Sequence, residues 1–392
     1  MADQRDIEKN IDTFIKEIIG EAIELRVSDI HIEAFETYGR IRLRVDGSLF
    51  EYMRIKLDNY EKLLTKIKLM SKMDIAEKRR PQDANLKLEE FSNIDFRLST
   101  INTVNGEKMV IRILSLVEFK KRAKLLGFTD DSLGKINKVL AQKSGMIIIT
   151  GPTGSGKSTS LYALLDKLNT GHENIISVED PVEYKIEGIN QVSINEKIDL
   201  SFAKALRSIL RQDPDIIMIG EIRDKETAQI AIRAAITGHL VLSTLHTTDA
   251  ISAIPRLRDL GVEDYLINSS LSLLISQRLV KRLCTCKEKS TMTDLEYQII
   301  KKHNNIDRNH PIYRPKGCSK CKNGYLGREA VEEVIVVDEE IKDLLRKGGE
   351  RSEEIKERLA KVGFKNMLEN GIDKVIEGKT SLEEILEKLD LG

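Results

Sequence analysis

The sequence predicts an α/β fold, in which a mostly parallel sheet lies between helices. A smaller α+β domain precedes this core, and a cysteine-bearing subdomain and C-terminal helices follow it. From about residue 127, short apolar runs alternate with helical segments, which is the pattern of strand–helix units in a parallel sheet. The apolar run 146–150 leads through a glycine-rich turn directly into a helix. Before residue 115, polar and apolar residues alternate instead, which predicts the α+β domain.

The first predicted domain comprises residues 1–115. Apolar residues at helical spacing predict helices at 11–26 and 59–73. The pairs Asp46-Gly47 and Asn105-Gly106 are typical of hairpin turns. Alternation predicts strands at 28–34, 39–45, 49–53, 91–99 and 108–114. The charged segment 116–126 carries no motif, and we expect a linker there.

The predicted core comprises residues 127–281. Phosphate-binding loops in such sheets lie at the carboxyl ends of the strands, so polar residues that follow the strands are candidates for a site. The expected strands are 146–150, 174–178, 215–220 and 240–244, and the expected helices are 159–168, 202–211 and 228–237. A four-cysteine subdomain at 282–330 and a C-terminal helical region at 331–392 complete the predicted organisation.

The composition limits the kinds of protein this can be. With 392 residues and 41% hydrophobic content, the chain can form packed cores, which excludes a disordered protein. Lys plus Arg and Asp plus Glu both number 63, so the net charge of +0 gives no global attraction to DNA or to an anionic membrane. The N-terminus lacks the apolar segment of a signal peptide, and no stretch of about 18 apolar residues occurs. We therefore expect a cytoplasmic protein.

The glycine-rich turn fits the phosphate-binding pattern GxxxxGK[ST]. Its glycines let the backbone wrap around a phosphate, and the N–H groups at the start of the helix point toward an anion. We expect Lys157 to reach the β- and γ-phosphates of ATP, and the hydroxyl of Ser158 to bind Mg²⁺. A turn without a ligand would need neither side chain. The expected nucleotide-binding residues are Gly151, Pro152, Thr153, Gly154, Ser155, Gly156, Lys157, Ser158 and Thr159.

Acidic residues follow two of the predicted strands. Glu221 follows the run 216–220 and is the candidate for organising Mg²⁺ and its water. The strand at 175–178 ends in three carboxylates within five residues, Glu179, Asp180 and Glu183. A carboxylate held near the γ-phosphate can orient and deprotonate the attacking water.

Two histidines flank the predicted strand 240–244. A single histidine is more often a structural residue with its hydrogen bonds satisfied. His239 and His246, however, stand at the ends of a strand beside the phosphate site. This placement favours a role in sensing the γ-phosphate.

These segments resemble a known family. GPTGSGKST, VEDPVEY, LRSILRQDPDIIMIGEIRD and AAITGHLVLSTLHTTDA are similar to the Walker A, Asp-box, Walker B and His-box motifs of the secretion ATPase superfamily. That family powers type II secretion, type IV pilus assembly and competence pseudopilus assembly. SDIHIE, RLRVDG, KRRPQDA and GEKMVIRIL resemble its first domain, and GYLGREAVEEVIVVDEEI and GFKNMLENGIDKVIEGKTSLEEIL resemble its tail. The resemblance covers nearly the whole chain and implies a RecA-like P-loop ATPase core.

The resemblance also implies roles for individual residues. Glu183 would be the general base, with Asp180 the weaker candidate, and Glu221 would be the Walker B glutamate. The catalytic set that it implies is Glu183, Glu221, Lys157, His246, His239, Asp180 and Arg44.

Assembly is the next implication of the resemblance. The family works as a ring of six subunits, with the nucleotide held between the first domain of one subunit and the core of another. Arginines of the first domain would then neutralise charge that develops on the phosphate. Arg42, Arg44 and Arg54 are the candidates, and the alternative is that they are solvent-facing strand residues.

The family's biology gives expectations about partners. We expect a homo-hexamer at the cytoplasmic face of the membrane, bound peripherally through an inner-membrane platform protein and without nucleic acid. Movement between the two main domains about 116–126 would drive filament assembly. The chain begins almost directly at the domain that holds SDIHIE, which favours a member without the extra N-terminal docking domain. The alternatives are a pilus retraction ATPase, a RecA-like nucleic-acid translocating motor, and a scaffold that binds nucleotide without turnover.

The four cysteines form two pairs, Cys284-x-Cys286 and Cys318-x-x-Cys321. Two thiol pairs in a cytoplasmic protein predict one closed structural Zn²⁺ site per chain, whereas disulfides would suit a secreted protein. Assembly ATPases of the family carry two CxxC pairs here, and retraction ATPases lack them. The first pair departs from that spacing, which leaves His303 or His310 as substitute ligands and free thiols as the alternative.

Overall fold

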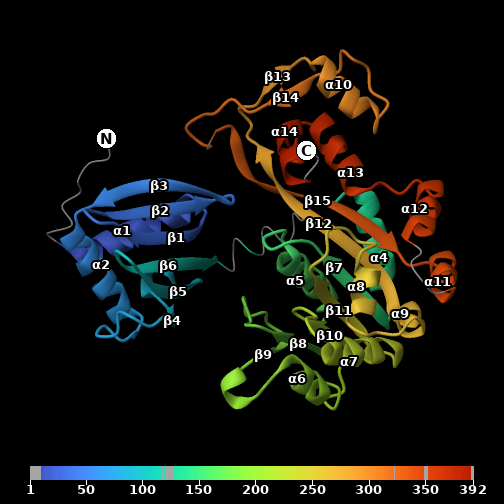
Figure 1. Cartoon of the computed structure of the whole chain (residues 1–392), viewed down its shortest axis with the longest axis horizontal. Coiled ribbons are helices and arrows are strands. Elements are labelled where there is room, and N and C mark those ends of the chain that lie inside the picture. Colours follow the sequence, from blue (N-terminus) through green and yellow to red (C-terminus); the bar gives the residue numbers. More distant parts are fainter. Residues whose placement is uncertain (1–9, 116–118, 120–126, 322, 348–351, 390–392) are drawn as a thin grey trace. The chain divides into compact units, whose positions relative to one another are not determined.

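The computed structural model describes residues 10–115, 119, 127–321, 323–347 and 352–389. The chain forms two compact units, Met1–Lys120 (unit 1) and Lys121–Gly392 (unit 2), shown in Figure 1. Except for Phe119, the predicted linker at 116–126 lies outside the described residues. Among the helices of the described ranges, none is both long enough and apolar enough to span a bilayer.

Unit 1 is an antiparallel sheet of six strands with the order β3-β2-β1-β6-β5-β4. Its helices pack on one face, because α1 and α2 bury apolar residues against Ile30, Ile32, Ile41 and Leu43. Its elements are α1 Ile11–Glu24, β1 Val27–Ala34, β2 Gly39–Val45, β3 Ser48–Ile55, α2 Leu57–Met70, β4 Gln82–Leu86, the short helix η1 Glu89–Phe91, β5 Ile94–Thr103 and β6 Gly106–Ser115. The predicted α+β domain therefore agrees with this unit, although β4 was not predicted.

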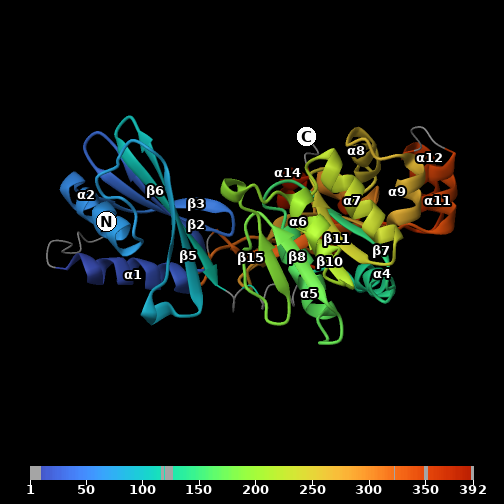
Figure 2. The ribbon, with the colours of Figure 1, turned by 90° about the horizontal axis from the view of Figure 1, so that it is seen from below.

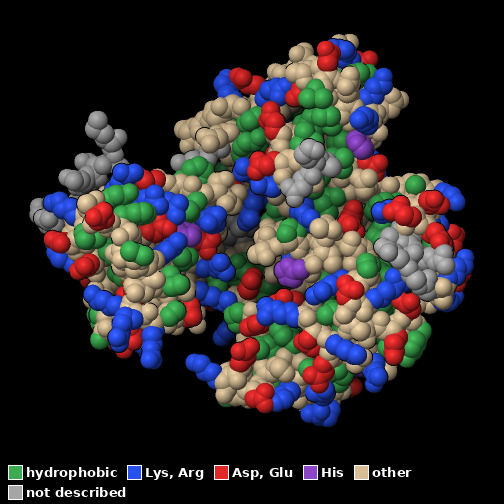
Figure 3. Space-filling view, in the orientation of Figure 1, with side chains coloured by type: hydrophobic (Ala, Val, Ile, Leu, Met, Phe, Trp, Pro, Cys, Tyr) green, Lys and Arg blue, Asp and Glu red, His purple; other side chains and the backbone are tan. Residues whose placement is uncertain are grey.

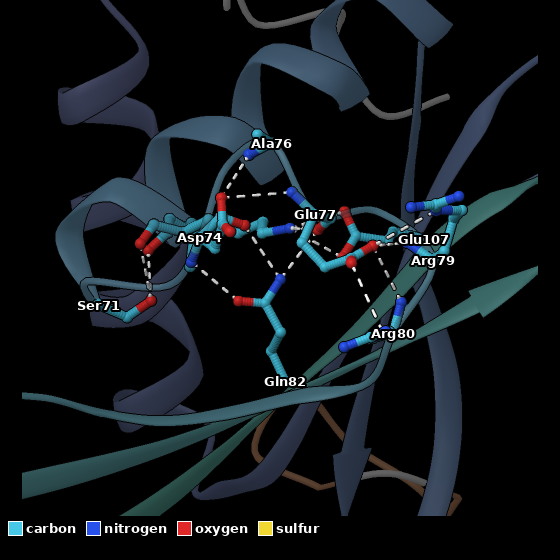
Figure 4. Close-up of polar contacts among 10 residues, drawn as sticks. Ser71, Asp74, Ala76, Glu77, Arg79, Arg80, Gln82 and Glu107 are labelled. Atoms are coloured by element: carbon cyan, nitrogen blue, oxygen red, sulfur yellow. Dashed lines mark hydrogen bonds and ion pairs between the residues drawn. The ribbon is translucent and has the colours of Figure 1, made fainter.

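The loop between α2 and β4 is held by polar side chains (Figure 4). Lys68 is buried, and its ammonium donates to the carbonyl of Glu77 at 2.7 Å and to the Glu107 carboxylate at 2.9 and 3.1 Å. The Gln82 amide donates to the carbonyls of Asp74 at 3.0 Å and Glu77 at 2.9 Å, and it accepts from the Asp74 N–H. These bonds connect the loop before β4 to α2 and to β6.

Unit 2 contains a sheet of seven strands with the order β15-β12-β7-β11-β10-β8-β9. All neighbours are parallel except β15, which is antiparallel to β12. Its elements up to residue 283 are α4 Asp130–Leu140, β7 Gly145–Thr150, α5 Lys157–Leu168, β8 Ile175–Glu179, β9 Asn190–Ser193, the short helix η2 Glu196–Ile198, α6 Phe202–Ile209, β10 Ile216–Ile219, α7 Lys225–Ile236, β11 Leu240–Leu245, α8 Ala253–Asp259, α9 Asp264–Ser270 and β12 Leu271–Leu283.

Helices cover both faces of this sheet (Figure 2). One large core joins α6 and α7 to the residues Met146, Ile148, Ile217 and Ile219 of the central strands. α5 lies on the other face and contacts β7 and β11. Every residue of β7, β8, β10 and β11 is buried, as expected for parallel strands that are covered on both sides. The predicted α/β fold with a mostly parallel sheet is confirmed.

The rest of unit 2 differs from the prediction at two boundaries. Its elements are β13 Glu288–Ser290, α10 Asp294–Lys301, β14 Ile312–Arg314, β15 Tyr325–Val336, α11 Glu339–Arg346, α12 Ser352–Lys361, α13 Met367–Ile376 and α14 Leu382–Lys388. The predicted helical region 331–392 is wrong at its start, because 331–336 belong to β15. The predicted core end at 281 likewise falls inside β12. Both errors have one cause: β12 and β15 pair with each other across about 50 residues, and local patterns do not show such pairing.

Candidate active site

The phosphate-binding loop joins the end of β7 to the start of α5. Gly151, Gly154 and Gly156 have φ angles of +144°, +80° and +92°, which residues with a Cβ rarely adopt. A Cβ at Gly151 would lie 2.5 Å from the hydroxyl of Ser155 and 2.6 Å from the carbonyl of Gln277. Glycine is therefore required at 151 both by the backbone and by the neighbouring strand.

Gln277 of β12 holds this loop, although no sequence motif marks this residue. Its side chain is buried, and its amide donates to the Ser155 carbonyl at 2.7 Å. Its amide oxygen accepts from the Ser160 hydroxyl, also at 2.7 Å. Gln277 thus ties both the loop and the first turns of α5 to β12. Six of the 13 residues of β12 are polar or charged, so no local signal distinguishes Gln277 from its neighbours in the strand.

Lys157 is the first residue of α5, and its ammonium folds back over the loop. It donates to the carbonyl oxygens of Gly151 at 2.8 Å and Pro152 at 3.0 Å. Burial lowers the pKa of Lys157, and the charge of Arg278 lowers it further, while Glu221 opposes both. A buried cation with neutral partners at a helix N-terminus is suited to bind an anionic phosphate.

The carboxyl ends of β8 and β10 bring the predicted acids to this loop. These strands are adjacent and in register, with Val178 opposite Ile219. The residues that follow them therefore meet at one edge of the sheet. A cavity of about 130 Å³ lies there, lined by Ser158, Tyr162, Glu179, Asp180, Glu183 and Glu221 among others.

The three clustered carboxylates have different surroundings. Glu179 is buried, and it accepts from the hydroxyl of Ser177 at 2.6 Å, from the amide of Gln191 at 3.1 Å and from the hydroxyl of Tyr162. Asp180 and Glu183 are exposed. Because both oxygens of Glu179 are engaged by protein donors, the two exposed acids are better placed to meet a water molecule.

Glu221 lies directly after β10, among charged neighbours. Arg223 pairs with Glu221 at 2.5 Å and with Asp180 at 3.4 Å. The ring of His246 lies 3.6 Å from the Glu221 carboxylate. Burial lowers the pKa of His246, as does the charge of Lys157, so the ring is neutral at pH 7. Arg223 was not among the residues predicted from the sequence, although it stands two residues after Glu221.

His239 does not join this group within the chain. It precedes β11, and its carbonyl accepts from the N–H of Gly145, the first residue of β7. Since β7 and β11 run parallel, this is the opposite edge of the sheet from Lys157 and His246. Its ring Nδ1 lies 3.0 Å from the carbonyl of Ala234. The predicted γ-phosphate role of His239 is thus not supported by the position of its ring, which lies among the groups at the end of α7.

The three candidate arginines lie on the strands of unit 1 and pair with acids there. Arg42 pairs with Glu33 at 2.6 Å, Arg44 with Asp29 at 3.8 Å, and Arg54 with Glu51 at 2.9 Å. Burial raises the pKa of Glu33, but hydrogen bonds from Arg42, Lys108 and Arg40 outweigh it and hold this pKa at about 2.

The four cysteines come together in space. Cys284 and Cys286 follow β12, and Cys318 and Cys321 precede β15. Their sulfur atoms all lie within 4.8 Å of one another, and the distances within three pairs are 3.6, 3.6 and 3.9 Å. The N–H of Cys286 donates to Cys284 and is the main reason that the pKa of this thiol falls to about 6. His303 and His310 are not part of this cluster.

Comparison with known proteins identifies the family. The family model "Type II/IV secretion system protein" matches residues 4–387. The chain belongs to the type II/IV secretion system protein family. The type II secretion system protein E of Aeromonas hydrophila is 44% identical over 375 residues, which are 95% of this chain and 74% of that protein. The type II secretion system ATPase E of Vibrio cholerae is 43% identical over 95% of this chain and 74% of its own length.

A further relative and two solved structures are similar as well. The type IV pilus assembly ATPase PilB of Acinetobacter baylyi is 44% identical over 95% of this chain and 65% of its own length. The solved structure of the pilus retraction motor PilT with bound ADP has a TM-score of 0.65 and 28% identity, and the match covers 95% of this chain and 96% of that chain. The Legionella pneumophila ATPase DotB, at 21% identity, shares the fold, with a TM-score of 0.69 over 95% of this chain and 94% of its own. The chain is therefore an ATPase of this family.

Proposed function

We propose that this ATPase is a Mg²⁺-dependent motor that drives assembly of a type IV pilus, pseudopilus or type II secretion filament. The observation that carries the proposal is the cavity beside the phosphate loop, where Ser158, Glu183 and Glu221 meet. Sequence similarity supports the same role. Over 95% of its length, this chain is 43% identical to a type II secretion ATPase and 44% identical to a pilus assembly ATPase. A cytoplasmic location at the inner face of the membrane follows from this role.

The residues around the cavity suit ATP hydrolysis. Lys157 and the backbone N–H groups of residues 153–159 would bind the phosphates, with Gly151 and Pro152 shaping the loop, and Ser158 with Glu221 would hold Mg²⁺. Bound there, Mg²⁺ would neutralise charge on the phosphate oxygens. Glu183 would orient and deprotonate the attacking water, with Asp180 the weaker candidate because Arg223 lies 3.4 Å from it. His246, neutral at pH 7, would hydrogen-bond the γ-phosphate.

The cysteine cluster suits one structural Zn²⁺ ion. Four thiolates at about 2.3 Å from a tetrahedral zinc ion place their sulfur atoms about 3.8 Å apart. The three distances of 3.6, 3.6 and 3.9 Å fit this geometry with thiols alone, so neither His303 nor His310 is needed. Such an ion would fasten the loop after β12 to the loop before β15.

Force generation requires partners. We propose a ring of six copies, bound through an inner-membrane platform protein, in which arginines from one subunit, Arg44 first among them, complete the active site of a neighbour. On the face shown in Figure 3, positive and negative side chains are interspersed. Together with the net charge of +0, this distribution does not favour a nucleic-acid motor.

Deleting the gene in its own organism tests the proposal and separates it from pilus retraction. Loss of an assembly motor should abolish surface filaments or secretion, and the wild-type gene should restore them where Lys157→Ala does not. Filaments that persist or become more abundant in the deletion strain would indicate retraction instead. For the purified protein we expect a mass of six subunits, hydrolysis that rises with subunit assembly, and about one zinc per chain. A monomer without turnover would contradict the ring.

A further inference from the structure

We propose that Tyr162 is a positioning residue that fixes Glu183 relative to the phosphate-binding helix. The inference rests on the proposed role of Glu183 as general base. Tyr162 lies on α5, four residues after Ser158, so the two side chains share one face of the helix. Both line the cavity beside the phosphate loop, together with Glu183.

The hydroxyl of Tyr162 connects two parts of the segment that follows β8. It donates to the buried carboxylate of Glu179, and it accepts from the backbone N–H of Glu183 at 3.2 Å. Its ring also meets the ring of Tyr184 edge to face, with 6.1 Å between centroids. Burial raises the pKa of Tyr162, and the charge of Glu179 raises it further, so the hydroxyl keeps its proton as a donor at physiological pH. One hydroxyl thus anchors the backbone of Glu183 to the helix that begins at Lys157.

The other side of the segment is held by β9. The amide of Gln191 donates to Glu179 at 3.1 Å and to the carbonyl of Tyr184 at 2.9 Å, and the hydroxyl of Ser193 accepts from the N–H of Val182 at 3.0 Å. These bonds fasten the segment to its own sheet. The bond to the Tyr162 hydroxyl connects the same segment to α5, the helix that follows the phosphate-binding loop. A general base must stand within hydrogen-bond reach of the water, so this second attachment sets its distance from the γ-phosphate.

The test is Tyr162→Phe, which removes the hydroxyl and keeps the ring. We expect kcat to fall about tenfold and KM for ATP to change by less than about twofold, because binding depends on the loop and not on Glu183. In a Glu183→Gln background the same substitution should produce no further fall in kcat. Hydrogen exchange of the backbone at 182–184 should become faster in Tyr162→Phe.

Tyr325→Phe is the matched control. It removes a hydroxyl that contacts Ser381 at 2.8 Å, away from the cavity, and it should leave kcat and the exchange at 182–184 unchanged. Melting temperatures of both variants report any loss of folding, and exchange is measured on folded protein. A slow Glu183→Gln with a wild-type rate in Tyr162→Phe would overturn the inference about Tyr162 alone. An equal fall in both backgrounds, or unchanged exchange at 182–184, would also overturn it. A Glu183→Gln variant with wild-type turnover would instead remove the proposed base, and the inference with it.

Discussion

Two buried lysines, Lys68 in unit 1 and Lys157 in unit 2, show how structural and functional charges differ. Lys68 donates to the Glu107 carboxylate at 2.9 and 3.1 Å and to one carbonyl, so its charge meets an opposite charge inside the protein. Lys157 donates to two neutral carbonyls of the phosphate loop, and burial lowers its pKa. A buried charge held only by neutral groups therefore points to a charged ligand, whereas a buried charge with an opposite partner stabilises the fold.

Removing Lys68 should have the largest effect on stability. In Lys68→Met the buried carboxylate of Glu107 loses its cation, and we expect the free energy of unfolding to fall by about 3–5 kcal/mol. Denaturant unfolding measures this change. Nucleotide binding should remain, because the phosphate loop is in unit 2. A stability loss below about 1 kcal/mol would show that the ion pair between Lys68 and Glu107 does not stabilise the fold.

Removing Lys157 should reduce ATP affinity and leave the stability of the fold nearly unchanged. In Lys157→Met we expect ATP affinity to fall roughly 100-fold, because the phosphate loses a desolvated charge partner. The free energy of unfolding should change by less than about 1 kcal/mol, since no buried carboxylate is left unpaired. Titration with a fluorescent ATP analogue gives the affinity. A Lys157→Met variant that unfolded easily but bound ATP normally would show that Lys157 stabilises the fold and does not bind the ligand.

The two histidines at the ends of β11 also differ in their surroundings. His246 lies 3.6 Å from the Glu221 carboxylate, whereas the His239 ring lies beside the Ala234 carbonyl at the far edge of the sheet. We expect His246→Ala to lower kcat about tenfold and His239→Ala to lower it less than about twofold. Steady-state ATP hydrolysis by both variants decides the point. A larger defect in His239→Ala would show that this histidine acts from a site outside its own chain.

These positions also show what the sequence could predict. The phosphate loop and the acids after β8 and β10 were predictable, because adjacent parallel strands end at one edge of a sheet. Gln277 was not, since its contact with Ser155 spans 122 residues and exists only through the pairing of β12 with β7. The sequence placed His239 and His246 at the two ends of one strand, which already implies opposite edges of the sheet, so the expectation that both lie beside the γ-phosphate did not follow from that placement.

Acidification should have a smaller effect than any of these substitutions. The pKa of Glu33 is about 2, below its usual 4.5, so the stability that Glu33 contributes is present above pH 4.5 and is lost as the pH falls toward 2. Between pH 5 and 3.5 we expect wild type to lose about 1 kcal/mol more stability than Glu33→Gln. Urea unfolding at both pH values measures the difference. An equal loss of stability in wild type and Glu33→Gln over this pH range would contradict the pairing of Glu33 with Arg40, Arg42 and Lys108.

The most direct test of the account is to measure ATP binding and phosphate release together for wild type and Glu183→Gln. The variant keeps the shape of the side chain and removes its ability to accept a proton. If Glu183 is the general base, ATP affinity should stay within about twofold of wild type, and phosphate release should slow by about 100-fold or more. Wild-type phosphate release by Glu183→Gln would contradict the account, because the carboxylate beside the phosphate loop would then not activate the water.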